Sequence, residues 1–223
     1  MQKLCRTLVK TLQFTKAIAH TYLNLAKIGF MQFEIMQQHT LYQGFFRLES
    51  WTFRHELFNG GWTSPFKREI FERGNAVAVL LHDPNADTVL LVEQFRPGSA
   101  LREPEQAWML EIVAGIVEDG ESTEEVARRE AQEEAGCHVD SVKHIMDFYP
   151  SAGGSTEVIS LYYAALDLSQ VKTGVFGLAD EHEDIRIQVV PFKQALQWLK
   201  AGKIKAALAI IALQWLALTQ LGG

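Results

Sequence analysis

Residues 115–137 of this 223-residue chain read GIVEDGESTEEVARREAQEEAGC. The part from Glu121 to Ala135 is rich in Glu, Arg and Ala, which are good helix formers. Ser122 or Thr123 is a suitable N-cap, and Gly136 follows where a left-handed residue would end the helix. The segment therefore predicts a helix with both ends marked in the sequence.

Three glutamates of this helix share one face. At 100° per residue, Glu130, Glu133 and Glu134 fall close together. Like charges on one exposed face repel by about a few tenths of a kcal/mol per pair unless a cation lies among them. Oxygen ligands without His or Cys select a hard ion, which predicts Mg²⁺, with Mn²⁺ as a substitute. The alternative for the helix alone is a solvated acidic face, the usual fate of a glutamate-rich run.

The glycine, arginine and glutamate spacing fills every fixed position of G-x5-E-x7-R-E-U-x-E-E-x-G-U, the Nudix box. The chain therefore resembles the Nudix hydrolase family. This resemblance implies that Glu130 and Glu134 bind the metal and that Glu133 supports catalysis. It also implies that Glu121 pairs with Arg129 to brace the fold. The structural positions of the box are then Gly115, Glu121, Arg129 and Gly136. Cys137 fills the last aliphatic position, where a buried, unreactive thiol is expected.

The resemblance extends well beyond the box, over about residues 33–218. Segments outside the box, including TLYQGFFRLE, FRHELFNG, REIFERGNAV and GLADEHEDIRI, are similar to bacterial Nudix enzymes that hydrolyse ADP-ribose. The implied reaction is Mg²⁺-dependent hydrolysis of the diphosphate to AMP and ribose 5-phosphate. One alternative is a preference for another nucleoside diphosphate sugar, such as ADP-glucose or GDP-mannose. A Nudix module that binds ADP-ribose without cleaving it is disfavoured because the box keeps all its glutamates.

The same resemblance implies further site residues. The backbone carbonyl of Ala114 and the carboxylate of Glu183 would complete the metal ligands, and Glu181 would be the general base. The implied substrate contacts are Phe45, Phe46, Arg68, Glu69, Arg73, Arg96, Ile116, Ser151, Gly153 and Glu157. The two phenylalanines would reach the other subunit's adenine pocket, which implies a homodimer with exchanged N-terminal strands. Taken alone, these aromatics fit ordinary core packing and the acidic loop 180–184 fits a solvated loop.

The remaining pattern predicts an α/β fold. Apolar runs at 76–81 and 89–95, joined by a Asp83-Pro84-Asn85 turn, predict a hairpin. Further strands are expected over 108–113, 142–148, 158–166 and 185–190, and further helices over 192–201 and 205–218. Since strict βαβ alternation is absent, the pattern favours an α/β sandwich with a mixed sheet over a doubly wound parallel fold. The resemblance implies the α/β/α sandwich of the Nudix type.

A small antiparallel β domain is expected ahead of this sandwich. Aromatic and apolar residues recur through 40–58, and Asn59-Gly60-Gly61 predicts a turn. The predicted organisation is a basic extension over 1–30, a β dimerisation domain over 31–74 and a Nudix catalytic domain over 75–223. The apolar run 204–221 is broken by Lys205, Gln214 and Gln220, so we expect a packed helix there and no membrane span.

Composition and charge limit the partners and the compartment. The chain is 48% hydrophobic and 22% charged, as in globular proteins, and its net charge of −6 offers no general attraction to nucleic acid. Two cysteines without metal-ligand spacing predict a reduced, cytoplasmic protein. All five charged side chains of residues 1–30 are basic. That segment could be a membrane or targeting helix, a docking helix or, the interpretation we favour, a weakly ordered extension upstream of a start at Met31.

Overall fold

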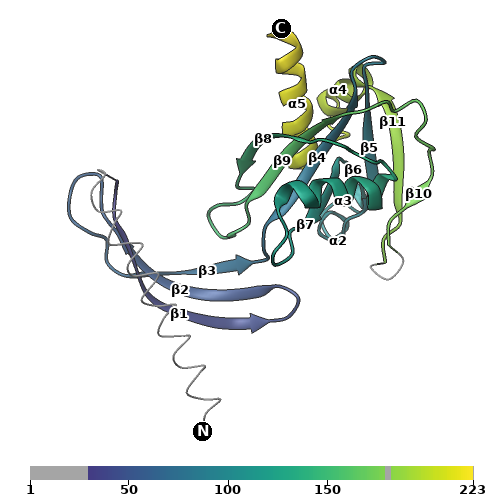
Figure 1. Ribbon diagram of the computed structural model, residues 1–223. Helices are drawn as coiled ribbons and strands as arrows, with labels where there is room; N and C mark the ends of the chain where they lie inside the picture. The colour runs from purple at the N-terminus through teal and green to yellow at the C-terminus, as the bar shows by residue number, and fades with distance from the viewer. Residues whose placement is uncertain (1–29, 179–181, 223) are drawn as a thin grey trace. The chain divides into compact units, whose positions relative to one another are not determined.

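The computed structural model describes residues 30–178 and 182–222, and the chain divides into two units, one ending at Phe71 and the other beginning at Glu72 (Figure 1). The first unit is a three-stranded sheet in the order β1-β2-β3. Its strands are β1 (Phe33–Gln43), β2 (Arg47–His55) and β3 (Phe66–Glu72). The interpretations of the basic segment 1–30 concern residues that lie, except for Phe30, outside the described ranges.

The run expected over 40–58 contains a hairpin between β1 and β2, which pair antiparallel. β1 begins earlier than the apolar pattern indicated, and β3 was not expected from the sequence. The predicted turn is present, with Gly60 and Gly61 both at φ +83°, where glycine carries no steric penalty. Glu49 is buried between the strands, where it accepts hydrogen bonds from Gln38 and Trp51. This polar cluster links β1 to β2 through side chains, in addition to their backbone pairing.

The second unit is built on an eight-stranded sheet. Six strands run in the order β10-β11-β5-β4-β9-β8, with β6 paired to β5 and β7 paired to β4. β4 and β9 are parallel while the other recorded neighbours are antiparallel, so the predicted mixed sheet is confirmed. The strands are β4 (Ala76–Asp83), β5 (Thr88–Phe95), β6 (Trp108–Glu111), β7 (Val113–Ile116), β8 (Lys143–Phe148), β9 (Ile159–Ala165), β10 (Val175–Phe176) and β11 (Ile185–Pro191).

The single strand expected over 108–113 is wrong, because two short strands occupy this region. β4 and β5 pair only next to their turn, at His82 with Val89 and at Asp83 with Thr88, and then diverge. β6 pairs with the far half of β5, and β7 pairs with the first half of β4. The chain therefore crosses from one partner to the other at Ile112. This crossing places the backbone of β7 in the interior of the sheet, directly ahead of the box helix.

Helices cover both faces of this sheet (Figure 1). The box helix α3 (Thr123–Ala135) lies on one face, and α4 (Phe192–Lys200) and α5 (Ala207–Leu221) lie on the other. Successive residues of β4 alternate between the two cores: Ala78 and Leu80 face α4 and α5, whereas Val77 and Val79 face α3. The predicted α/β/α sandwich is thus confirmed. Two short helical segments between β5 and β6 were not expected, α2 (Pro97–Ala100) and η1 (Pro104–Gln106).

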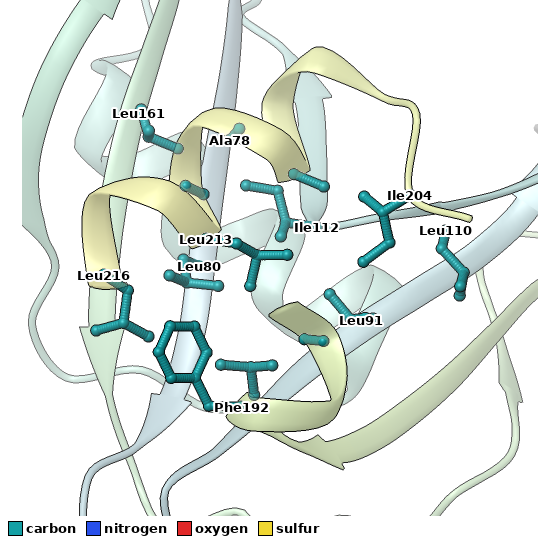
Figure 2. Close-up of a cluster of buried hydrophobic side chains, with 14 of the residues drawn as sticks. Ala78, Leu80, Leu91, Leu110, Ile112, Leu161, Phe192, Ile204, Leu213 and Leu216 are labelled. Atoms are coloured by element: carbon teal, nitrogen blue, oxygen red, sulfur yellow. The ribbon is translucent and has the colours of Figure 1, made fainter. Parts of the chain in front are cut away.

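The apolar C-terminal run is a packed helix, as expected. α5 buries Ala209, Ala212, Leu213 and Leu216 against the sheet, and Figure 2 shows Leu213 and Leu216 among residues from β4, β5 and α4. In the described part of the chain, no helix is long and apolar enough to cross a membrane.

Leu213→Ala tests whether this core holds the second unit together. The Leu213 side chain is fully buried, so we expect its truncation to lower the free energy of unfolding by about 2–5 kcal/mol. Leu218 lies on the same helix but is 70% exposed, so Leu218→Ala should change that value by less than about 0.5 kcal/mol. Urea denaturation of both variants measures the difference, and equal losses would contradict this packing.

Candidate functional site

Both ends of α3 are fixed by the residues that the sequence marked. Ser122 is the N-cap, and its side chain and that of Glu125 form a reciprocal capping box. Gly136 is the C-cap at φ +62°, and a Cβ there would lie 2.8 Å from the Phe176 ring. The helix therefore begins and ends at defined positions, which sets the register of its glutamates against the sheet.

Two of the three glutamates are buried, so the alternative of a solvated acidic face is wrong for them. Glu130 is 9% exposed and Glu134 is 2% exposed. On the helix they share one face with Val126, Ala127 and Ala131, which pack against the sheet with no exposed surface. Their carboxylates therefore sit on the apolar face of α3, and burying such groups is unfavourable unless they find partners.

The Glu134 carboxylate reaches the interior strands. Its Oε2 accepts a hydrogen bond from the backbone N–H of Ala114 on β7 (3.0 Å), and its Oε1 lies 3.5 Å from the amide nitrogen of Gln94 on β5. Ala114 pairs with Ala78 in an antiparallel register. In antiparallel strands the N–H and C=O of one residue point to the same side. The Ala114 carbonyl thus faces the same side as Glu134, where the sequence predicted a metal ligand.

Gly115 makes the close approach of α3 and β7 possible. A Cβ at this position would lie 1.8 Å from Oε1 of Glu130, a distance that no real contact tolerates. Position 115 of β7 therefore requires glycine, because the Glu130 carboxylate of α3 occupies the space that a side chain would fill.

Arg129 joins the remaining charges of the box. Its guanidinium donates to Glu121 (Nε–Oε1, 3.1 Å), to Glu130 (Nη1–Oε1, 2.7 Å) and to Glu133 (Nη1–Oε2, 2.9 Å). It also lies 3.5 Å from the carbonyl of Ile116, at the end of β7. One arginine thereby ties the loop after β7 to the helix and neutralises part of the acidic cluster.

Burial and mutual repulsion change the acidity of this cluster. Burial is the main cause that raises the pKa of Glu130 to about 7, with further contributions from Glu133 and Glu183. Burial likewise raises the pKa of Glu134 to about 8, and Glu130 and Glu183 add to the shift. Glu183 itself accepts a hydrogen bond from the N–H of Leu178 (3.1 Å). Glu130, Glu134 and Glu183, from two distant parts of the sequence, therefore repel one another at one place.

The donor set fits a hard divalent cation, since it consists of carboxylate and carbonyl oxygens without sulfur or imidazole. Within residues 30–178 and 182–222, however, no three acidic, imidazole or thiol side chains converge closely enough to hold a cation as they stand. Arg129 forms an ion pair with the Glu130 carboxylate, so a cation that binds this carboxylate would compete with the arginine. Glu181, the predicted general base, lies outside the described residues.

The predicted substrate contacts divide between the two units. In the second unit, Arg73 forms an ion pair with the buried Glu157 (3.1 Å). Ser151 accepts two backbone hydrogen bonds, from Gly154 and Ser155, in the loop after β8, where Gly153 has open space around it. Their roles in binding stay predictions.

In the first unit, the predicted contacts lie at the β1–β2 turn and on β3. Phe45 is 86% exposed and meets Phe46 edge-on (4.7 Å between ring centroids). The Arg68 guanidinium lies 4.7 Å from the centre of the Phe66 ring, and Glu69 is exposed. An exposed aromatic ring such as that of Phe45 suits stacking on a flat base, and this role also stays a prediction.

The structure adds two residues that the sequence analysis missed, Gln94 and Glu111. Gln94 contacts Glu134, and Glu111 pairs with Arg96 (Nε–Oε2, 2.6 Å). Both are buried polar residues within apolar strand runs. A polar residue within an apolar strand run was the signal in the sequence that could have indicated these two residues, because a buried polar side chain needs a partner.

Comparisons with known proteins agree with this fold and site. Residues 72–211 match the family model described as the NUDIX domain. A crystal structure described as an ADP compounds hydrolase has a TM-score of 0.64 and 19% identity, covering 86% of this chain and 95% of that one, a likeness that shows the fold alone. The chain belongs to the Nudix family.

Particular relatives share most of the chain. The ADP-ribose pyrophosphatase of Escherichia coli K12 is 50% identical over 185 residues, which cover 83% of this chain and 88% of that protein. The ADP-ribose pyrophosphatase of Haemophilus influenzae is 46% identical over 188 residues, covering 83% and 86%. The GDP-mannose pyrophosphatase of Yersinia enterocolitica is 35% identical over 186 residues, covering 83% and 95%.

The raised pKa values predict how pH changes the stability of the metal-free protein. A carboxyl whose pKa is about 8 when folded and 4.5 when unfolded binds its proton more tightly in the folded state. Stability should therefore fall as pH rises from about 4.5 through about 8, by up to about 1.4 kcal/mol per pH unit for each such group. Urea denaturation in EDTA, from about pH 5 to about pH 8, measures this slope.

Glu134→Gln is the control, since it removes one titrating group with little change of shape. Its stability should exceed that of the parent protein increasingly as pH rises. Parallel pH profiles for the two proteins would contradict the raised pKa. A divalent cation held by these carboxylates would stabilise the parent protein most at the alkaline end, where the ionised groups need release no proton to bind it.

Proposed function

We propose that this protein hydrolyses the diphosphate of ADP-ribose to AMP and ribose 5-phosphate with a divalent cation, Mg²⁺, which Mn²⁺ can replace. The choice of ADP-ribose as the substrate rests on the 50% identity, over most of both chains, to a relative named ADP-ribose pyrophosphatase. Relatives named GDP-mannose pyrophosphatase are less similar, at 32–35% identity. That difference favours ADP-ribose over GDP-mannose.

The cation is proposed to bind at the interface of α3 and β7. Glu130, Glu134, Glu183 and the Ala114 carbonyl would hold it, and the first two carry the carboxylates whose burial is otherwise unfavourable. When bound, Mg²⁺ neutralises diphosphate charge and lowers the pKa of a bound water. The Ala114 N–H and Gln94 orient the Glu134 carboxylate before any ligand arrives.

The chain's own cations and acids complete the proposed reaction. Arg96 and Arg73 suit the diphosphate and the terminal ribose because the guanidinium fork binds phosphate oxygens through paired hydrogen bonds. Glu181 is proposed as the base that takes the proton of the attacking water, a role that contributes about 10²–10⁴-fold in comparable enzymes. Glu133 supports the site through Arg129, with which it pairs.

A cytoplasmic location is proposed for the protein. A homodimer is also proposed, in which the first unit of one subunit contributes substrate contacts to the site of the other. β1 supports the dimer: all its residues are at least partly exposed, and they include Phe33, Ile35, Met36, Leu41 and Tyr42. Such an extended apolar strand invites pairing or coverage by a second chain.

Glu134→Gln, together with a substrate panel, tests the reaction. The purified protein with Mg²⁺ should cleave ADP-ribose faster than ADP-glucose, GDP-mannose, NADH or diadenosine polyphosphates, and product analysis should find AMP and ribose 5-phosphate. Glu134→Gln should lower kcat on the order of 100-fold or more by removing a charge from the reacting centre. The variant should remain folded, because the lost charge is one that burial disfavours. Glu124→Gln, on the exposed side of α3, should leave kcat unchanged.

Other outcomes have distinct meanings for this proposal. Faster cleavage of another nucleotide sugar would retain the diphosphate chemistry and overturn the substrate. Near-normal turnover by Glu134→Gln would overturn the metal site.

Co-expression of two variants tests the exchange between subunits. Phe45→Ala should raise the KM for ADP-ribose roughly 10-fold or more through lost stacking. If Phe45 acts on the partner's site, a hybrid dimer of one Phe45→Ala subunit and one Glu134→Gln subunit has one intact site. Hybrids can be isolated by co-purification of two differently tagged subunits. They should recover activity at low substrate concentration. Hybrids no more active than the two parent variants would show that Phe45 serves its own subunit or none.

A further inference from the structure

Arg96 lies at a point where the backbone is already fixed. Its N–H donates to the carbonyl of Ala107 (2.7 Å), the residue directly before β6. The next residue is Pro97, which begins α2, and a residue before proline is restricted to extended conformations. Arg96 accordingly has φ −121° and ψ 106°. The guanidinium can move only through the side-chain torsions.

Glu111 removes much of that remaining freedom. One carboxylate oxygen, Oε2, accepts a hydrogen bond from Nε of Arg96 (2.6 Å) and lies 2.6 Å from Nη2 in an ion pair. The Glu111 side chain is 9% exposed, whereas that of Arg96 is 38% exposed. Glu111 is itself anchored in β6, opposite Val92 of β5. The buried carboxylate is thus a fixed point, and the arginine extends from it toward solvent.

The held guanidinium faces the acidic cluster. Arg96 is the residue directly after β5 and keeps an extended backbone, so its side chain lies on the same side as that of Gln94, two residues earlier. Gln94 reaches Glu134, and Arg96 also interacts electrostatically with Glu134. A guanidinium has five N–H donors, and the hydrogen bond to Glu111 uses the one on Nε, so donors on the two Nη groups remain for a ligand beside the Glu134 carboxylate.

A carboxylate next to an anion-binding arginine has a cost, because it neutralises charge that would attract a diphosphate. Simple attraction would be better served by an unpaired arginine. What Glu111 provides instead is orientation, since a free arginine side chain loses rotamer entropy when a ligand orders it. A small misplacement of a positioning group can reduce turnover by as much as about 100-fold.

We propose that Glu111 is a positioning residue that holds the Arg96 guanidinium in place for the diphosphate. This inference rests on the proposed function, since it requires a diphosphate substrate at this site. It does not require ADP-ribose in particular, because every nucleoside diphosphate sugar presents the same group.

A double-mutant cycle on the full-length enzyme tests the proposal. Glu111→Ala should lower kcat/KM on the order of 10-fold or more. Glu111→Gln keeps an acceptor for the Arg96 Nε–H and should recover most of that loss. In an Arg96→Ala background, Glu111→Ala should cost less than about 2-fold further, because a residue that acts through Arg96 has no effect without it. Glu93→Ala removes another ion pair of β5, on its opposite face, and should leave kcat/KM unchanged.

A second measurement separates positioning from support of the fold. Thermal unfolding of each variant reports stability, and titration calorimetry with ADP reports diphosphate binding without turnover. We expect Glu111→Ala to weaken ADP binding in the parent background and to leave it unchanged in the Arg96→Ala background. If Glu111→Ala does not fold, the shape-retaining Glu111→Met takes its place in the same cycle.

Several results would overturn the inference. Glu111→Ala could leave kcat/KM and ADP binding unchanged, or its effect could be as large without Arg96 as with it. Arg96→Ala could alone have no effect on either quantity. A parent enzyme that prefers another nucleotide sugar would defeat the proposed substrate but not this inference, since the cycle then runs on that sugar. A parent protein that cleaves no diphosphate would defeat the proposed function, and ADP binding would still decide the pairing of Glu111 with Arg96.

Discussion

The contact between α3 and β7 is the constraint on which the second unit depends. The helix lies so close to the strand that the Glu130 carboxylate takes the space of a side chain at Gly115, and Glu134 reaches the N–H of Ala114. Buried carboxylates are unfavourable in an apolar core, and their raised pKa values express that cost. The surrounding sandwich holds them in place: Val126, Ala127 and Ala131 anchor the helix to the sheet on the same face.

The divergence of β4 and β5 makes this contact possible. Where those strands separate, β6 and β7 enter the sheet and bring Glu111, Ala114 and Gly115 into its interior. A continuous β4–β5 hairpin would leave no place for an interior backbone that can meet a helix. The apolar cores on the two faces of the sheet then hold these interior strands from both sides, with α4 and α5 on the face away from the box helix.

Charge in the site is arranged in linked pairs. Arg129 balances Glu121, Glu130 and Glu133, while Arg96 balances Glu111 and faces Glu134. An acidic protein can receive an anionic diphosphate only if its few local cations are well placed or if metal ions assist. In the proposed site both needs would be met, because the carboxylates would hold the metal and the fixed guanidinium groups would attract the phosphates.

The amino-acid sequence by itself determined the ends of the box helix, the mixed α/β class and the packed C-terminal helix, because caps, apolar periodicity and turn residues act over short distances. It also indicated the family, since the box fixes residue types at set spacings. Only the tertiary structure decided that the run 108–113 is two strands, that Glu130 and Glu134 are buried, and that Gln94 and Glu111 join the site. Each of these depends on which strands become neighbours. Contacts between residues far apart in the chain, such as Arg96 with Glu111 or Glu183 with Glu134, follow from strand order, which local patterns do not specify.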